Sequence, residues 1–422
     1  MVRKGDAVDM DSQRKIAIIG AGPAGMMSAI YASDNGASVT VFEKNQCVGK
    51  KLAITGKGRC NVTNDCDNAE FLKNVIANPK FLYASISNFD TQDTKAFFEG
   101  AGVPLKTERG RRVFPASDNA HDIVNALKSQ MLSRGCTLKN EKVLAILTDN
   151  GRVRGLKTSR GEYELDAVIC ATGGISYPGT GSDGDGFKFA KSLGIKVTEL
   201  APSLVPLETS ENVSEIMGLS LKNITLTAID NESGKAVYSE LGEMLFAHFG
   251  LTGPLVLSAS SHMKNMKNGK YTVTIDLKPA LDLGELDRRV LSDFSKGTNK
   301  DFQNSLGALL PSKIIPYIVR RSGIGATTKV NEITKEQRKA FVSLLKGLSF
   351  EIKGFRPIKE AIITAGGIDA SEINPSTMKS KKIDGLYFAG EVIDTHAYTG
   401  GYNLQIAFST GALAGMHSAW GD

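Results

Sequence analysis

The chain of 422 residues has few cysteines, and their spacing carries no signal for metal or redox chemistry. Cys47, Cys60, Cys66, Cys136 and Cys170 form neither a CxxC pair nor a metal-ligand pattern, so we expect no metal site. An odd number of cysteines also argues against a fully paired disulfide framework and favours a reducing cytoplasm.

Long hydrophobic runs and a strong charge of one sign are missing as well. No apolar stretch approaches the roughly 20 residues of a membrane span, and the polar segment Met1–Lys15 has no signal-peptide core. We therefore expect a cytoplasmic protein without a membrane partner. The net charge is +6, and its densest basic groups, Arg109–Arg112 and Lys379–Lys382, contain no aromatic residues. No nucleic-acid partner is expected from this pattern.

The length exceeds that of one ordinary hydrophobic core. Strand and helix signals alternate in both chain ends, whereas the middle first shows short alternating strands and then helical periodicity. This predicts an α/β protein with a Rossmann-type nucleotide-binding domain built from both chain ends, interrupted by an insertion. The predicted bounds are 1–195 and 359–422 for the Rossmann-type domain, 196–280 and 347–358 for a β-rich insert, and 281–346 for a helical subdomain.

A dinucleotide-binding fingerprint follows the first predicted strand. Gly20-Ala-Gly22-Pro-Ala-Gly25 has the GxGxxG spacing and opens a predicted helix. Gly20 permits the tight turn, Gly22 lets the backbone approach a pyrophosphate, and Gly25 allows close packing of helix on strand. Glu43 ends the next predicted strand, where its carboxylate can accept hydrogen bonds from ribose hydroxyls and disfavours NADP. The fingerprint alone does not separate FAD from NAD.

Four further stretches resemble those of one known family: Gly49–Asn64, Ala171–Gly181, Gly242–Pro254 and Tyr398–Gln405. On these motifs the chain resembles the BaiN/YhiN-like bacterial flavoproteins, a family that includes a dehydro-bile-acid reductase and an aminoacetone oxidase. The resemblance extends over nearly the whole chain from Ile16. It implies FAD as the cofactor and a build of flavin domain, inserted β-barrel-like domain and helical subdomain. The chain departs from the family's common pattern at Thr395-His396, where an acidic residue is frequent beside Asp394.

The resembling motifs supply most of the expected FAD-binding residues. The loop Thr55–Arg59 combines glycines with hydroxyl and cationic groups, so it can wrap a ribityl–pyrophosphate chain with Lys51 or Arg59 offsetting charge; a solvated loop is the alternative. Gly400-Gly401 precedes a predicted helix whose N-terminus can stabilise negative charge on the flavin by about 0.3–2 kcal/mol. The expected set is Gly20, Gly22, Pro23, Ala24, Gly25, Glu43, Lys44, Lys51, Leu52, Thr55, Gly56, Gly58, Arg59, Cys60, Asn61, Thr63, Asn64, Val143, Ala171, Thr172, Gly173, Gly174, Gly390, Glu391, Asp394, Gly400, Gly401, Asn403 and Leu404.

A second GxGxxG match, Gly179–Gly184, does not directly follow a strand and lacks an acid-ended strand about 20 residues later. We interpret it as a loop near the isoalloxazine ring and not as a second nucleotide site. NADH or NADPH would then dock transiently as electron donor, or another donor would serve.

The leading functional hypothesis is FAD-mediated, NAD(P)H-dependent reduction of an activated C=C bond in a small, steroid-like or bile-acid-like enone. An acid must protonate the product, and Tyr398, His396 and Tyr177 are the candidate catalytic donors, although each of these residue types is more often structural. Two alternatives stay open. One is a flavin oxidase of a small amine or aminoketone that releases hydrogen peroxide, and the other is an FAD-binding redox-sensing or partner-binding module without turnover.

Overall fold

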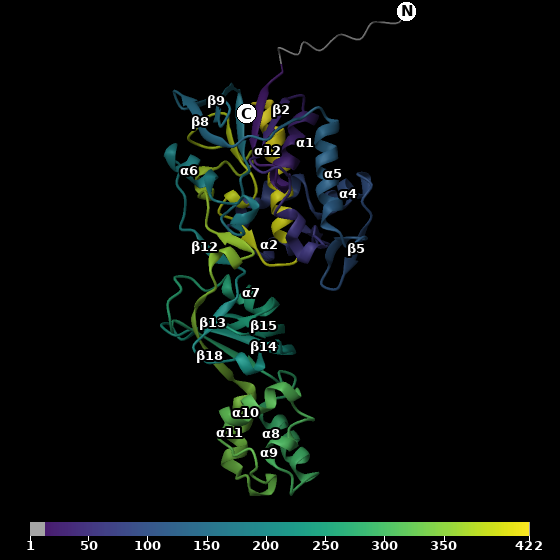
Figure 1. The fold of residues 1–422 in the computed structure, drawn as a ribbon, viewed down its shortest axis with the longest axis vertical. Coiled ribbons are helices and arrows are strands. Elements are labelled where there is room, and N and C mark those ends of the chain that lie inside the picture. The colour runs from purple at the N-terminus through teal and green to yellow at the C-terminus, as the bar shows by residue number, and fades with distance from the viewer. Residues whose placement is uncertain (1–12, 422) are drawn as a thin grey trace, which may run out of the picture. The chain divides into compact units, whose positions relative to one another are not determined.

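The computed structural model describes residues 13–421, so most of the polar segment Met1–Lys15 lies outside the described residues. The chain forms two compact units. One comprises the chain up to Pro202 together with residues from Ile362 onward, and the other is Ser203–Ala361 (Figure 1).

A parallel five-stranded sheet forms the core of the first unit, with the strand order β20-β11-β1-β2-β7. Its strands are β1 (Lys15–Ile19), β2 (Ser38–Phe42), β7 (Thr137–Lys139), β11 (Ala167–Cys170) and β20 (Leu386–Phe388). In β1, β11 and β20 nearly every residue is buried, as expected for parallel strands that are covered on both faces. Since β20 comes from the C-terminal part of the chain, both chain ends complete one sheet.

Two helices from opposite ends of the sequence lie side by side on this sheet, α1 (Pro23–Asp34) and α12 (Tyr402–Trp420) (Figure 1). Their backbones approach closely because small residues lie at the contact. A Cβ at Gly411 would lie 2.5 Å from the Ala24 carbonyl oxygen, and one at Gly415 would lie 2.5 Å from that of Ser28. This close packing places the middle of α12 beside the first turns of α1.

Smaller elements surround the sheet. An antiparallel sheet holds β10 (Glu162–Glu164), β9 (Arg152–Thr158) and β8 (Val143–Asp149), and a second holds β3 (Thr63–Asn64), β6 (Arg112–Pro115) and β5 (Leu105–Glu108). A short pair joins β21 (His396–Ala397) to β4 (Val75–Ala77). The helical elements are the 3₁₀ segments η2 (Leu52–Gly58), η3 (Pro79–Leu82), η4 (Pro178–Thr180), η9 (Ala370–Glu372) and η10 (Gly390–Val392), and the helices α2 (Asn68–Lys73), α3 (Tyr83–Asn88), α4 (Thr91–Gly100), α5 (Ala120–Ser133) and α6 (Asp185–Ser192).

The second unit contains a closed six-stranded barrel with the order β13-β16-β15-β14-β17-β18. The strands are β13 (Leu207–Thr209), β14 (Ser220–Asp230), β15 (Lys235–Ala247), β16 (Gly250–Thr252), β17 (Tyr271–Asp276) and β18 (Leu348–Phe355), and pairing of β13 with β18 closes the barrel. Buried and half-buried residues alternate along β17, which is typical of a strand with one face in a core. The helix α7 (Pro254–Ser260) follows β16.

Four helices are inserted between β17 and β18: α8 (Leu283–Ser295), α9 (Phe302–Ser305), α10 (Ile315–Ser322) and α11 (Lys335–Lys346). Phe302 makes edge-to-face contacts with Phe294 and Phe341, which joins three of these helices through aromatic packing. The predicted fold class, a Rossmann-type domain from both chain ends with an inserted barrel-like domain and helices, is confirmed. Within residues 13–421, no helix has both the length and the apolarity that crossing a bilayer requires.

Candidate flavin-binding site

The three fingerprint glycines, of which Gly20 and Gly22 precede α1 and Gly25 lies in its first turn, have different surroundings. A Cβ at Gly25 would lie 1.9 Å from the Gly20 carbonyl oxygen, and one at Gly20, where φ is +100°, would lie 2.7 Å from that of Ala171. Packing therefore requires glycine at both positions. A Cβ at Gly22, in contrast, would meet no atom within 4 Å. The middle glycine thus borders open space at the N-terminus of α1, which fits a site for a pyrophosphate.

Glu43 follows β2 and is a buried carboxylate held by neighbouring N–H groups. Its Oε2 accepts a hydrogen bond from Ala21 N at 2.8 Å, and its Oε1 accepts bonds from Asn45 N and Nδ2, both at 2.8 Å. These bonds fix the carboxylate beside the fingerprint turn. That is the position which the sequence predicts for contact with a ribose.

Lys44 connects this end of β2 to the loop Gly179–Gly184. Its Nζ lies 2.6 Å from Oδ1 of Asp183 and 3.0 Å from Oδ2 of Asp185, while Asn45 Nδ2 donates to the Thr180 carbonyl oxygen. Burial alone would raise the pKa of Asp185, but hydrogen bonds from Lys188 and Lys44 hold it below its ordinary value. The contacts of this loop therefore run to Lys44 and Asn45 after β2, and its place near the isoalloxazine ring stays a prediction.

The segment from Thr55 to Cys60 has an unusual backbone. Gly56, Lys57, Gly58 and Cys60 all have positive φ, although only two of them are glycines. Left-handed conformations are costly for other residues and concentrate where ligands bind. Next to them, the Asn61 Oδ1 atom is buried and accepts no hydrogen bond from any described residue. A buried acceptor of this kind fits a site that awaits a donor from a ligand.

Arg59 extends from this segment toward the hairpin of β5 and β6. Its guanidinium lies 4.2 Å from the centre of the Phe114 ring, hydrogen-bonds to Glu108, and lies 2.6 Å from Oδ1 of Asp118. Two carboxylates therefore already balance the positive charge of Arg59, which the sequence analysis expected to offset the charge of a pyrophosphate. Cys60 is fully buried, and burial raises the pKa of its thiol to about 12, which agrees with a packing role.

The other predicted cation, Lys51, belongs to a polar network around Glu391. Lys51 Nζ lies 2.6 Å from Glu391 Oε2 and donates to Ser176 Oγ at 2.7 Å. Ser176 Oγ and Thr364 N both donate to Glu391 Oε1, each at 3.0 Å. A Cβ at Gly174 would lie 2.3 Å from Thr364 Oγ1, so this network also requires the glycine.

At the C-terminal side, Gly400 and Gly401 have φ of +121° and +99° and lead into α12. A Cβ at Gly401 would lie 2.3 Å from the Thr63 carbonyl oxygen, so β3 and the start of α12 are in close contact. The Asn403 side chain accepts a hydrogen bond from Ala397 N and donates to the carbonyl oxygens of Ala397 and Tyr398. Asn403, predicted to bind the cofactor, thus fixes the backbone that precedes the glycine pair.

The candidate proton donors occupy two segments. His396 is buried in β21, which pairs with β4, and Tyr398 is half-buried two residues later. Tyr177 is half-buried on the loop that carries Ser176, and its φ of +51° is left-handed. Asp394 Oδ2 accepts a hydrogen bond from Thr198 Oγ1 at 3.1 Å. The structure thus places His396 and Tyr398 in the segment just before the glycine pair, and Tyr177 in the loop that follows β11.

The remaining predicted cofactor residues lie on the same elements as those described above. Pro23 and Ala24 begin α1, Leu52 begins η2, Val143 begins β8, Thr172 and Gly173 follow β11, and Gly390 follows β20. Gly390 N donates to Thr410 Oγ1 at 2.9 Å, which ties this turn to α12. Leu404 lies in the first turn of α12. Ser176, Thr364 and Asn45 were not predicted as site residues, because nothing local in the sequence marks them.

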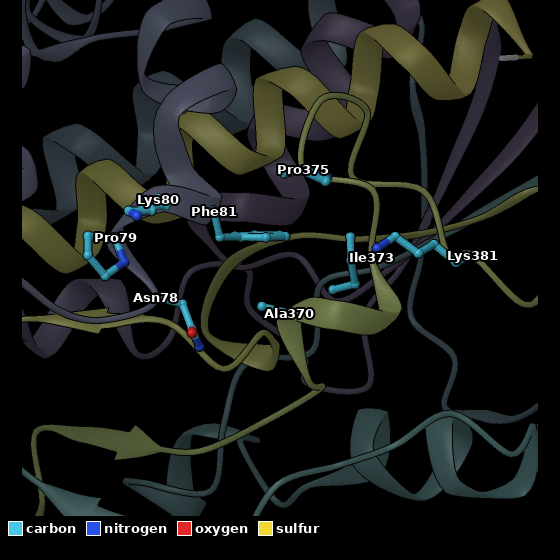
Figure 2. Close-up of a pocket in the computed structure, with 8 residues that line it drawn as sticks. All are labelled: Asn78, Pro79, Lys80, Phe81, Ala370, Ile373, Pro375 and Lys381. Carbon is cyan, nitrogen blue, oxygen red and sulfur yellow. The ribbon is translucent and has the colours of Figure 1, made fainter.

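A separate pocket of about 460 Å³ lies between η3 and η9 (Figure 2). Asn78, Pro79, Lys80, Phe81, Ala370, Ile373, Pro375 and Lys381 line it. Asn78 Nδ2 donates to the Asp394 carbonyl oxygen at 2.7 Å, so the pocket adjoins the segment that leads to His396. In the described part of the chain, no group of three or more His, Cys, Asp or Glu side chains is arranged to hold a metal ion.

The parallel sheet, the fingerprint turn with its open central glycine, and the buried acid after β2 define a Rossmann-type dinucleotide-binding domain. The model of the HI0933-like protein Rossmann domain matches residues 14–417, and the chain belongs to this family. The family resemblance seen in the sequence is therefore confirmed.

Two relatives match over nearly their whole length. The 3-dehydro-bile acid delta(4,6)-reductase of Clostridium scindens is 29% identical over 410 residues, which cover 96% of this chain and 99% of the relative. The ribosomal RNA dihydrouridine synthase of Haemophilus influenzae is 32% identical over 401 residues, which cover 93% and 95%. Because that name refers to RNA, the expected absence of a nucleic-acid partner stays a prediction.

Among solved structures, the 3-ketosteroid delta1-dehydrogenase of Sterolibacterium denitrificans has a TM-score of 0.52 to this chain. The sequences are 12% identical, and the likeness covers 97% of this chain and 100% of that one. At this identity the likeness shows the fold alone.

Proposed function

We propose that the chain reduces a C=C bond conjugated to a carbonyl group, using bound FAD and electrons from NADH or NADPH. The observation that carries this proposal is the shared chemistry in the names of the two relatives. The delta(4,6) double bonds of a 3-oxo steroid are conjugated to its carbonyl group, and so is the double bond that becomes saturated in dihydrouridine. Both acceptors are electron-poor alkenes.

When bound, FAD supplies two-electron hydride chemistry to such an acceptor. The chain's own part is to hold and polarise the site. The N-terminus of α12 after Gly401 offers free N–H groups and the positive end of a helix dipole, which would stabilise the negative charge of a reduced flavin ring held beside it. The Lys51–Glu391 pair, with Ser176 and Thr364, fixes the loop after β11 against the turn after β20.

The second task of the chain is to deliver a proton to the product carbon. We assign this role to the hydroxyl group of Tyr398, with His396 and Tyr177 as the other candidates. Asn403 Nδ2 donates a hydrogen bond to the carbonyl oxygen of Tyr398. This bond fixes the Tyr398 backbone, from which the phenol side chain extends, close to the glycine pair. A positioned general acid of this kind contributes about 100-fold or more to a rate.

For the substrate, we favour a small steroid-like enone. A uridine in RNA is the second candidate, and the relative from Haemophilus influenzae is the observation that favours it. The steroid-like enone and the uridine would be reduced at the same site. The two candidates differ only in the part of the substrate that the surface around this site must bind.

An anaerobic titration of the FAD-loaded protein tests the proposal. NADH or NADPH should remove the absorbance of the oxidised flavin, and a 3-oxo-Δ4 steroid or a uridine-containing RNA should restore it with an equal amount of saturated product. If neither donor reduces the flavin, the proposal is wrong. Recovery only with oxygen, with peroxide formed at the rate at which an amine substrate is lost, would instead support the oxidase alternative.

A further inference from the structure

The turn between β5 and β6 carries three exposed guanidinium groups. Arg109, Arg111 and Arg112 flank Gly110, and all four residues are exposed. Arg111 has a φ of +58°, a left-handed conformation that a side chain such as arginine adopts at an energetic cost. We call residues 109–112 the arginine tip. The function of the flavin site described above does not use it.

The arginine tip is joined to the glycine pair at the start of α12 by one side chain. Asn64 Nδ2 donates to the carbonyl oxygens of Gly110 and Gly400, in both cases at 3.1 Å. Asn64 is also the partner of Arg112 in the ladder between β3 and β6, and the next residue donates its N–H to the Arg111 carbonyl oxygen at 2.7 Å. The tip is therefore fixed at the edge of the site in which we place the flavin ring.

The charge of the arginine tip is not balanced by its neighbours. Three acids in or next to β3, β5 and β6 pair with other cations: Glu108 and Asp118 bind Arg59, Asp118 also binds Lys106 at 2.6 Å, and Asp65 binds Lys95 at 2.9 Å. Over residues 13–421, none of the three tip arginines forms an ion pair. Three positive charges without an ion-pair partner thus lie on the hairpin that Asn64 joins to the glycine pair.

We infer that the arginine tip binds phosphate groups of a ligand that reaches the flavin site. A guanidinium can hold an oxyanion through two parallel hydrogen bonds, so three adjacent guanidiniums suit a ligand with more than one phosphate. The inference deepens the proposed function, because the donor and one candidate substrate of the same site have this chemistry. The phosphates would come from the pyrophosphate of NADH or NADPH, or from the backbone of an RNA strand.

The test compares three FAD-loaded proteins: wild type, the double variant Arg109→Gln/Arg111→Gln, and the control Lys128→Gln/Lys191→Gln. The control removes the same charge from exposed lysines on α5 and α6. Arg112 is kept because its Nε donates to the Arg109 carbonyl oxygen within the turn. Fluorescence anisotropy measures binding of a labelled uridine-rich oligoribonucleotide over a series of salt concentrations. Stopped-flow absorbance measures anaerobic flavin reduction against NADPH concentration.

We expect the double arginine variant to bind at least one of these ligands about tenfold more weakly, with the lysine control close to wild type. For RNA, the magnitude of the slope of log K against log salt should fall by about 1.4, which is about 0.7 for each of two lost phosphate contacts on a single strand. An effect on RNA alone identifies a polynucleotide, and an effect on NADPH alone identifies the electron donor.

The inference is overturned if the double arginine variant and the lysine control handle both ligands alike, or if wild type binds neither. The proposed function can fail separately. A flavin that neither NADH nor NADPH reduces would contradict the proposed function, while arginine-dependent binding of RNA in the same sample would still support the phosphate site.

Discussion

Lys51 Nζ lies 2.6 Å from Glu391 Oε2, although 340 residues separate the two in the sequence. The pair joins the segment between β2 and η2 to the turn after β20, and both side chains are only about one-fifth exposed. Its partners Ser176 and Thr364 come from two further segments. Four distant parts of the chain therefore meet in one polar network beside the predicted flavin site.

We predict that Lys51 and Glu391 stabilise the apoprotein cooperatively. Lys51→Met leaves a partly buried carboxylate without its cation, and Glu391→Gln leaves the cation without its carboxylate, so each change should lower the free energy of unfolding. Urea unfolding of wild type, both single variants and the double variant gives a coupling energy, which we expect to be about 1 kcal/mol. Additive losses in the double variant would show that the pair is not coupled.

The thiol groups should react in two classes. Cys47 is exposed, whereas Cys60, Cys66, Cys136 and Cys170 are buried. Burial raises the pKa of Cys60 to about 12, and burial followed by the nearby charges of Asp67 and Glu70 raises that of Cys66 to about 11. A raised thiol pKa keeps the neutral, unreactive form, so raising the pH from 7 to 9 should not expose these groups to a thiol reagent.

We therefore expect one fast-reacting thiol in the native protein and five after denaturation. Cys47→Ser should remove the fast phase and leave the four slow thiols unchanged. A fast phase that persists in this variant would mean that one of the buried cysteines is accessible.

The proposed proton donor can be tested by separating the two half-reactions. Tyr398→Phe removes one hydroxyl group and should slow reoxidation of the reduced flavin by an enone about 100-fold. Reduction by NADH should change little, because that step takes no proton from the phenol. Stopped-flow absorbance measures both rates, with Tyr177→Phe as the matched control. Equal slowing in the two variants, or none in either, would contradict the assignment to Tyr398.

Much of the first unit could be predicted from the sequence because its signals are local. The buried strand, the glycine turn, the helix and Glu43 follow one another within 30 residues, and each has a distinct pattern. The helix after Gly401 was predicted for the same reason, because the glycine pair marks its start, and it extends to Trp420.

The rest depends on contacts between distant segments. Thr364 lies 189 residues from Ile175, whose N–H it binds, and nothing near Thr364 in the sequence marks that contact. From the sequence alone, Arg59 is a good candidate to bind the pyrophosphate. In the folded chain, Glu108 at the end of β5 and Asp118 after β6 pair with its guanidinium instead. The loop Gly179–Gly184 likewise contacts Lys44 and Asn45 through side chains. These contacts form only when the folded chain brings the two segments together, so no local pattern predicts them.

The central claim is that FAD lies with its pyrophosphate against Gly22 at the start of α1, and two alanine substitutions test it most directly. In Gly22→Ala the added methyl group meets no protein atom within 4 Å, so unfolding of the apoprotein should change by less than about 1 kcal/mol. In Gly25→Ala the methyl group would lie 1.9 Å from a backbone oxygen, so the fold itself should lose about 1–3 kcal/mol.

The decisive measurement is the dissociation constant of FAD for wild type and Gly22→Ala, obtained by titrating the apoproteins and following flavin fluorescence. We predict tight binding by wild type and a constant at least about tenfold higher for Gly22→Ala, a loss of about 1.4 kcal/mol, with the apoprotein still folded. Equal affinity of the two proteins, or wild-type protein that takes up no FAD, would contradict the account.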